Sequence, residues 1–270
     1  MSASLFPLAK RFEDLSADDL WHFIRNVMVE RDSEALTPEE KTKLMDFRSG
    51  FGNIFTRHAY YQQVYCGPLH RALTEIHRRY PDGSRVLDVG CGVGTQSILF
   101  SLLPATVLGI DINRGQLSTA GKRREFYARY FKTGMDIEFR RVDMLATAFA
   151  DLGRFDVVYS HESMGRFLKA EQVFEKVSAA MNRGGLLILK NENPQCLGLR
   201  LAKKPIDLDG EKAYREAAQR HGFRTVSIRG TTAIPRKFWF AGNLTRIPDA
   251  LLRRLNLFRI HLEMTFEKAG

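Results

Sequence analysis

Between residues 85 and 190, short apolar runs alternate with stretches of helical pattern, and this alternation limits the fold more than any other feature. Five runs predict strands, in the order Arg85–Val89, Ala105–Ile110, Ile137–Val142, Phe155–Ser160 and Leu186–Lys190. Two more predicted strands follow an amphipathic helix that ends near Gly222, at Arg224–Ile228 and Ile260–Phe266. Short apolar strands separated by helices are typical of a parallel sheet covered on both faces. The sequence therefore predicts an α/β fold, a doubly wound, mostly parallel seven-stranded sheet with helices on both faces.

The first eighty residues predict only helices. Ser16 with Asp19 resembles a capping box ahead of an apolar stretch. The segment 37–40 (TPEE) places Thr at the N-cap, Pro at the first helical position and Glu at the third. A third helix is predicted over residues 56–80. We therefore expect an N-terminal helical layer, or lid, in residues 1–80 and one larger domain in residues 81–270.

Composition narrows the class of protein. The hydrophobic fraction of 44% is ordinary for a globular chain, and no run reaches the roughly 20 apolar residues that span a bilayer. Cys66, Cys91 and Cys196 show no close pairing, and the seven histidines lack metal-ligand spacing. We therefore expect no transmembrane segment, no disulfide framework, no metal site and a cytoplasmic location.

The net charge of +10 fits three kinds of partner: nucleic acid, an anionic membrane surface or phosphorylated small molecules. The basic residues, however, occur in short groups dispersed along the chain, such as residues 122–124, 203–204 and 253–254. Solvated surface faces explain such groups equally well. Charge alone does not identify a partner.

The segment Val86–Thr95 (VLDVGCGVGT) carries three glycines at alternate positions directly after a predicted strand. A strand that turns through glycines into a helix brings its backbone close to a ligand, because no Cβ stands in the way. The dinucleotide fingerprint G-x-G-x-x-G is not met, because Thr95 or Ser97 occupies the position of its third glycine.

The segment resembles instead the D-x-G-x-G-x-G motif of class I S-adenosylmethionine (SAM)-dependent methyltransferases. The resemblance extends over roughly residues 85–190 and implies an enzyme whose cofactor is SAM. It implies that the loop of Gly90, Gly92 and Gly94 packs against the methionine part of SAM and that Asp88 helps to hold the amino group.

The same resemblance assigns the ends of the next strands to the nucleoside. Asp111 ends the second strand, where its two carboxylate oxygens can accept both ribose hydroxyls, and Ile112 lies beside it. Asp143 is expected to accept from the adenine amino group, and Met144 to cover the ring. Taken singly, the two aspartates could also be carboxylates that cap loops. Gln116 and Ser160 complete the expected cofactor site.

The acceptor is expected at the carboxyl ends of the strands, next to residues 159–167 and 191–194. His161 titrates near neutrality and is a candidate general base, although it could equally bind nearby backbone. Glu162 could stabilise a cation near the reacting centre or simply begin a helix.

Two short segments, Asp111–Leu117 and Tyr159–Ser163, are similar to the sterol, tocopherol, cyclopropane-forming and prenyl-diphosphate methyltransferase group. This resemblance implies an apolar acceptor, an alkene among the options, whose methylation would create a carbocation that Glu162 and aromatic faces could stabilise. The candidate substrate-binding residues are Tyr60, Tyr61, Tyr65, Phe167, Arg236 and Trp239. The tyrosines could equally be core.

The sequence thus favours a methyltransferase acting on a small, apolar, prenyl or aromatic molecule, by C- or O-methylation. The alternative is an RNA or protein methyltransferase that uses the basic surface. The Pro-Pro-aromatic turn and the Pro-Cys motif of base-methylating enzymes are absent. A SAM-binding protein without catalysis is a third interpretation.

Overall fold

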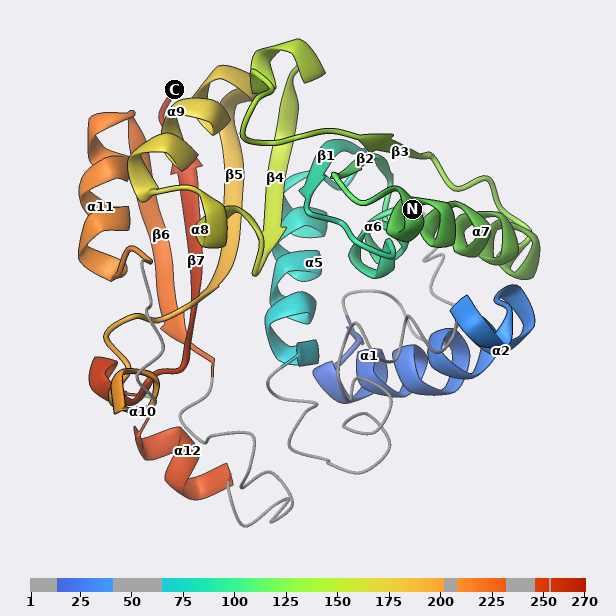
Figure 1. The fold of residues 1–270 in the computed structure, drawn as a ribbon, viewed down its shortest axis with the longest axis horizontal. Helices are drawn as coiled ribbons and strands as arrows, with labels where there is room; N and C mark the ends of the chain where they lie inside the picture. Colours follow the sequence, from blue (N-terminus) through green and yellow to red (C-terminus); the bar gives the residue numbers. More distant parts are fainter. Residues whose placement is uncertain (1–13, 41–64, 202–207, 232–245, 253) are drawn as a thin grey trace. The chain divides into compact units, whose positions relative to one another are not determined.

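The computed structural model describes residues 14–40, 65–201, 208–231, 246–252 and 254–270 (Figure 1). Its described part contains seven strands in one sheet, in the order β3-β2-β1-β4-β5-β7-β6. Their bounds are β1 Ser84–Val89, β2 Ala105–Asp111, β3 Ile137–Arg141, β4 Phe155–His161, β5 Met181–Glu192, β6 Phe223–Gly230 and β7 His261–Lys268. The pairs β1–β4, β2–β3 and β4–β5 are parallel, whereas β7 is antiparallel to both β5 and β6. The predicted α/β fold with a mostly parallel seven-stranded sheet is confirmed.

Some of the described helices precede β1, and the others lie between successive strands. The described α-helices are α1 Ala17–Phe23, α2 Glu30–Ala35, α5 Gly67–Arg79, α6 Thr95–Phe100, α7 Arg114–Phe131, α8 Met164–Phe167, α9 Ala170–Ala180, α10 Leu197–Leu201, α11 Glu211–Arg220 and α12 Arg246–Leu252. A π-helix, η2 (Ile24–Val29), joins α1 to α2, and two short 3₁₀ helices are η4 (Phe149–Leu152) and η6 (Asn256–Phe258). None of the described helices is long and apolar enough to cross a bilayer.

The chain divides into two compact units, one of residues 1–84 with 91–141 and the other of residues 85–90 with 142–270. The division runs through the glycine-rich segment and not at residue 80. The N-terminal helices belong to the same unit as β2, α7 and β3. The expectation of an N-terminal segment in residues 1–80 and a larger domain in residues 81–270 stays a prediction.

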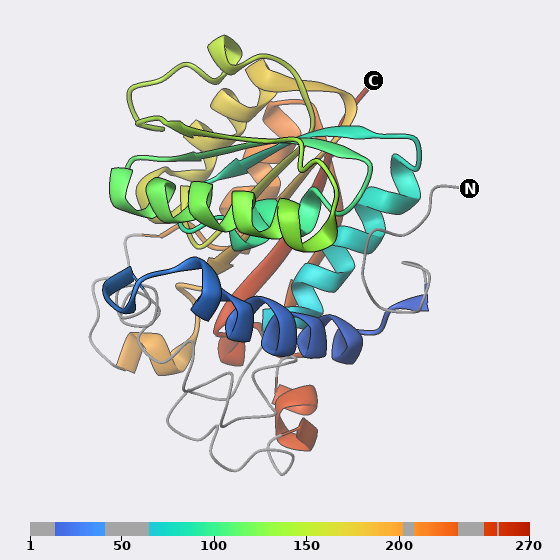
Figure 2. The same ribbon diagram turned by 90° about the vertical axis from the view of Figure 1, so that its right-hand side faces the viewer.

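In the first unit the N-terminal helices pack against α7, and Figure 2 shows them in blue beside the green α7. The rings of Phe23 and Phe131 stack at 6.0 Å between centroids. The predicted capping box of α1 is present: the Asp19 amide donates to Ser16 Oγ (3.1 Å), and the Ser16 amide donates to Asp19 Oδ2 (2.8 Å). Local capping and the burial of one apolar face therefore explain why this layer is helical.

The second predicted helix start has the same reciprocal geometry. The Glu40 amide donates to Thr37 Oγ1 (3.3 Å), and the Thr37 amide donates to Glu40 Oε2 (3.0 Å). Two orphan amides at the start of a helix are thereby satisfied, as the sequence predicted.

In the second unit α9 and α11 lie side by side next to the strands β5, β6 and β7 (Figure 1). The ring of Phe174 on α9 is the centre of this core, within 5.0 to 6.4 Å of the rings of Phe266, Phe223 and Tyr214. Strand β5 begins five residues earlier than predicted. The chain is already in the sheet at the Gly184-Gly185 pair, with Gly184 at a φ of +73°.

Candidate functional site

The glycine loop has a left-handed backbone at each predicted glycine: φ is +74° at Gly90, +56° at Gly92 and +76° at Gly94. An L-residue is strained in this region, so glycine is required by the backbone itself. At Gly94 a Cβ would also meet the Phe139 ring at 2.6 Å. The loop is therefore fixed both by conformation and by close neighbours.

In the first unit, Asp111 holds the loop from the end of β2. Its Oδ2 accepts from the Gly92 amide (3.0 Å), and its Oδ1 accepts from the Asn113 amide (2.8 Å). Each carboxylate oxygen has about two acceptor positions, so each can accept a further hydrogen bond. Asp111 therefore caps the loop and keeps the capacity to accept from a diol.

The helix α7 begins directly after Asp111, and its N-cap is Asn113, whose side chain accepts from the Gln116 amide (3.1 Å). Gln116 Oε1 would lie 3.0 Å from a Cβ on Gly92, so the Gln116 side chain covers the loop. Ile112 is 56% exposed, although it is a large apolar residue at the end of a buried strand. An exposed apolar side chain at this position suits contact with a ligand ring.

In the second unit, Gly90 lies against Ser163, and a Cβ at Gly90 would come within 2.0 Å of Ser163 Oγ. Ser160 is fully buried, and its hydroxyl donates to the Val89 carbonyl (3.2 Å) and accepts from the Met164 amide (3.0 Å). The geometry of Ser160 therefore joins β4 to β1 and caps α8. Asp88 is buried in β1.

Asp143 is exposed and caps the turn after β3, where its Oδ1 accepts from the Leu145 amide (2.9 Å). Met144, predicted to cover a ring, is half-buried, whereas Leu145 is 52% exposed. Leu145, which directly follows Met144 in the sequence, was not predicted.

A charged cluster lies at the carboxyl ends of β4 and β5 in the second unit. Glu162 is its centre, with Oε1 3.3 Å from Nε2 of His261 and 3.7 Å from Nε2 of His161, and with Oε2 3.0 Å from the Arg166 guanidinium. Burial alone would raise the pKa of Glu162, but hydrogen bonding to the two histidines and their charge outweigh it and hold this pKa well below its usual value. Glu162 is thus a carboxylate kept ionised.

Glu162 also has an unusual backbone, with φ at +53°, while its amide donates to the Lys190 carbonyl (2.7 Å). A non-glycine residue in this region is strained, and such strain is common at functional sites. The strained turn directs the carboxylate into the cluster.

Lys190, buried at the end of β5, has its Nζ 3.0 Å from Nε2 of His161. Nε2 of His161 therefore lies between the Lys190 ammonium and the Glu162 carboxylate. Lys190 was not among the predicted residues. A single cation that ends the apolar run LLILK is the signal that could have identified it.

His261 also escaped prediction, because it comes from β7, and its place opposite Glu192 of β5 depends on strand register. Register across an antiparallel pair far apart in sequence is not readable from one chain. In the described part of the chain, no group of three His, Cys, Asp or Glu side chains is arranged to hold a metal ion.

The predicted substrate-binding residues fall into three groups: one is exposed, one is buried, and four lie outside the described residues. Phe167 on α8 is 63% exposed and available for contact. Tyr65 is buried, and its hydroxyl accepts from Gln96 Nε2 (3.0 Å), which is the core geometry that the sequence left open. Tyr60, Tyr61, Arg236 and Trp239 lie outside the described residues.

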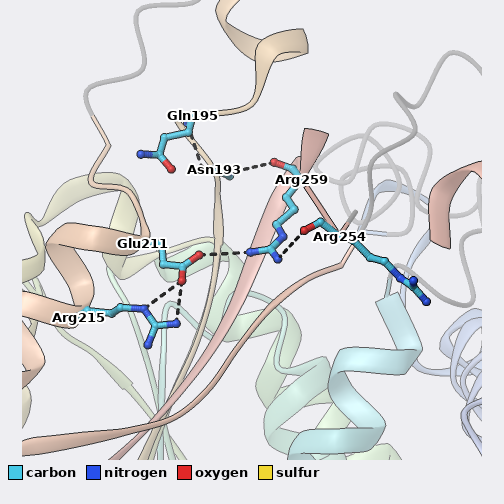
Figure 3. Close-up of polar contacts among 6 residues, drawn as sticks. All are labelled: Asn193, Gln195, Glu211, Arg215, Arg254 and Arg259. Carbon is cyan, nitrogen blue, oxygen red and sulfur yellow. Dashed lines mark hydrogen bonds and ion pairs between the residues drawn. The ribbon is translucent and has the colours of Figure 1, made fainter. Parts of the chain in front are cut away.

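A second polar network supports the loop that follows β5, and Figure 3 shows its six residues. The Asn193 side chain donates to the Arg259 carbonyl (2.9 Å) and accepts from the Gln195 amide (3.1 Å). The Arg259 guanidinium donates to Glu211 (3.3 Å) and to the Arg254 carbonyl (3.2 Å), and Arg215 also donates to Glu211 (2.8 Å). These bonds tie α11, the chain before β7 and the loop after β5 together.

The fold and these strand-end residues define a class of protein, and comparison with known families gives the same one. The family model described as a methyltransferase domain matches residues 81–228, and the chain belongs to this family of SAM-dependent methyltransferases.

Two curated proteins are similar in sequence to different shares of this chain. A ubiquinone biosynthesis O-methyltransferase of Brucella anthropi is 30% identical over 51% of this chain and 52% of the relative. A 24-methylenesterol C-methyltransferase 2 of Arabidopsis thaliana is 26% identical over 90% of this chain and 70% of the relative. The chain spans about half the length of the first of these relatives.

Among solved structures, a magnesium protoporphyrin IX methyltransferase from Synechocystis superposes with a TM-score of 0.51 at 19% identity, covering 77% of this chain and 87% of that chain. At this identity the likeness concerns the fold. Similar folds support many reactions, so the acceptor has to be argued from the site.

Proposed function

We propose that this chain transfers the methyl group of SAM to a small, apolar acceptor. The observation that carries the proposal is Asp111, whose two carboxylate oxygens bind the Gly92 and Asn113 amides and keep acceptor capacity for a diol. A carboxylate already oriented by backbone amides loses little side-chain freedom when a ligand binds. When bound, SAM supplies an electrophilic methyl group on a sulfonium.

The remaining cofactor roles are proposed from the resemblance to class I methyltransferases. Gly90, Gly92 and Gly94 keep the loop free of Cβ atoms, and Asp88 remains the proposed partner of the amino group. Ile112, which is 56% exposed, remains the proposed contact of the adenine, Met144 the residue proposed to cover the ring and Asp143 the proposed acceptor from its amino group. Ser160 remains a proposed cofactor-site residue, and its hydroxyl also holds the backbone at Val89 and Met164.

We assign the acceptor side to the cluster around Glu162. Methyl transfer from a sulfonium is an in-line displacement, so positioning contributes most and a base is needed only where the acceptor loses a proton. His161 is the proposed base, and its Nε2 can take a proton once the contact with Lys190 is released. Glu162, ionised and 3.7 Å away, would stabilise the imidazolium, or a carbocation if the acceptor is an alkene.

The relatives support a small acceptor but differ in the atom that is methylated. The Brucella relative is named as an O-methyltransferase, and the Arabidopsis relative, which covers more of this chain, is named as a C-methyltransferase. Both options fit the cluster, because each develops a positive charge that Glu162 can stabilise.

Calorimetric titration with S-adenosylhomocysteine, the demethylated product, tests the cofactor half. Asp111→Ala should weaken binding by roughly 1–3 kcal/mol, since it leaves hydroxyls of the ligand and the Gly92 amide without their acceptor. Asp136→Ala is the matched control, because Asp136 is also a carboxylate beside a strand end but binds Thr106. Equal affinity in both variants and in the wild type would remove Asp111 from the site.

Methyl transfer from labelled SAM into a metabolite extract, with mass analysis of the product, tests the acceptor half. On the acceptor found, His161→Asn and Glu162→Gln should lower turnover with little change in SAM affinity, and a general base typically contributes ~10²–10⁴-fold. An alkene acceptor needs the negative charge of Glu162, whereas a hydroxyl acceptor needs mainly its hydrogen bonds. Near-wild-type turnover in both variants would make the cluster structural.

A further inference from the structure

A buried arginine in the first unit connects the N-terminal helices to the glycine loop. Arg123 on α7 has a side chain only 2% exposed, and its Nε donates to Asp32 Oδ1 on α2 (2.9 Å). Its Nη1 donates to the Val93 carbonyl (2.6 Å) and to Thr95 Oγ1 (2.9 Å). One guanidinium therefore binds the helical layer at one end and the two neighbours of Gly94 at the other.

Tyr127 lies one helical turn further along α7 and adds contacts between α7 and the N-terminal helices. Its hydroxyl lies 2.7 Å from the Met28 carbonyl and 2.9 Å from Asp32 Oδ1. Burial raises the pKa of Tyr127, so its hydroxyl stays a donor. Burial alone would lower the pKa of Arg123, but the Asp32 charge outweighs this, and Arg123 keeps its proton.

A buried ion pair is a poor source of stability, because removing two charges from water costs about as much as their attraction returns. Packing alone would be served by apolar side chains of similar size. The contacts of Arg123 instead fix a carbonyl and a hydroxyl on either side of a glycine at a φ of +76°. Geometry, more than stability, is what this network supplies.

We propose that Asp32 and Arg123 are positioning residues, which hold the glycine loop in its cofactor-binding shape and couple that loop to the N-terminal helices. The inference rests on the proposed use of SAM. Coupling of this kind is reciprocal, so a ligand on the loop also stabilises the helices that hold Arg123.

Amide hydrogen exchange of the cofactor-free protein tests the positioning role directly. Cys91, Gly92 and Gly94 each donate their amide to a hydrogen bond within the first unit and report on the loop. Asp32→Asn removes the charge that holds Arg123, and Thr95→Val removes one acceptor with almost no change of shape. Both should speed exchange at these three amides by roughly tenfold, because a buried donor loses its partner.

The matched control is Arg124→Gln, a charge change on the next residue of α7. Arg124 donates to the Ile137 carbonyl of β3 and does not contact the loop among the described residues. It should leave exchange at Cys91, Gly92 and Gly94 as in the wild type. The S-adenosylhomocysteine affinity should fall about tenfold in the two test variants and remain unchanged in the control.

The possible results distinguish the positioning role of Asp32 and Arg123 from the proposed use of SAM. Unchanged loop exchange in Thr95→Val, or in a folded Asp32→Asn, would overturn the positioning role even if the melting temperature fell. If Asp32→Asn does not fold, Thr95→Val and Tyr127→Phe decide the matter, because both keep the ion pair. Loop exchange that speeds up in a protein that never binds S-adenosylhomocysteine would support the network and reject the proposed function.

Discussion

At the scale of single residues, Glu162 combines a strained backbone with an ionised, partly buried carboxylate. Its position and that of His161 could be predicted, because ligands gather at the carboxyl ends of parallel strands. The left-handed backbone, Lys190 and His261 could not, since a turn conformation and a register between distant strands decide them. The sequence therefore predicted the polar residues that end β4, but not the residues of β5 and β7 that contact them.

The depressed pKa of Glu162 predicts a pH-dependent stability. A carboxylate whose folded pKa lies below its ordinary value of 4.5 stabilises the fold above pH 4.5 and loses that contribution as the pH falls toward the folded value. The wild type should therefore exceed Glu162→Gln in unfolding free energy at pH 7, and the two should converge below pH 4.5. Urea unfolding at a series of pH values measures this difference.

The control for this series is Glu138→Gln, since Glu138 is an exposed carboxylate paired with Arg140 on β3. Its difference from the wild type should be small at every pH, as for most surface ion pairs. A Glu162→Gln difference that stays constant from pH 7 to pH 3 would show that the histidines do not depress this pKa.

The same residue predicts a backbone effect. Glu162→Gly removes the strain of a φ near +53° and also removes the carboxylate, whereas Glu162→Gln keeps the strain. A left-handed conformation costs an L-residue roughly 1–2 kcal/mol. Because neither variant carries the charge, Glu162→Gly should be the more stable of the two. The reverse order in urea unfolding would mean that the strain is absorbed elsewhere.

At the scale of elements, the strand–loop–helix order was predictable because apolar periodicity and capping are local signals. All seven predicted strands overlap observed ones, and both predicted helix starts have their capping bonds. The short helices α10 and α12 were not predicted. They carry little periodicity, and the network of Asn193, Glu211 and Arg259 supplies long-range support for the chain around them.

Two glycines on neighbouring elements should respond oppositely to alanine. Gly94→Ala places a Cβ 2.6 Å from the Phe139 ring at a φ of +76°, and it should destabilise the protein and distort the loop. Gly121 lies inside α7, and a Cβ there would meet no atom within 4 Å beyond the backbone of its own helix. Gly121→Ala should therefore stabilise by about 0.5–1 kcal/mol, because alanine is the better helix former.

Thermal unfolding of the two variants checks this pair. A melting temperature of Gly94→Ala at or above that of the wild type would contradict the close approach at Gly94, and a lower melting temperature of Gly121→Ala would contradict the open space at Gly121.

At the scale of the whole molecule, the net charge of +10 did not identify a partner, because the basic groups are scattered and many are paired locally. Arg220 and His221, for example, both bind Glu171, and Arg224 binds Glu267. The acceptor class likewise lies beyond the sequence, since the shape of an acceptor site depends on side chains from several distant segments.

A small-molecule acceptor predicts weak and non-specific binding to nucleic acid. In a fluorescence titration with a single-stranded RNA, any affinity should disappear near physiological salt, and methyl incorporation should survive nuclease treatment of the extract. An RNA methyltransferase would instead keep a tight complex whose affinity falls steeply but measurably with salt, and its labelled product would be lost on nuclease treatment.

The antiparallel strand β7 lies between β5 and β6, although it follows both along the chain. During synthesis β6 therefore leaves the ribosome before the strand that binds it, while β5 presents its edge to solvent. Unpaired strand edges are templates for association between nascent chains. The arrival of residues 261–268 pairs the open edge of β5 and the inner edge of β6 in one step, so the protection of both these edges against association waits for a single strand.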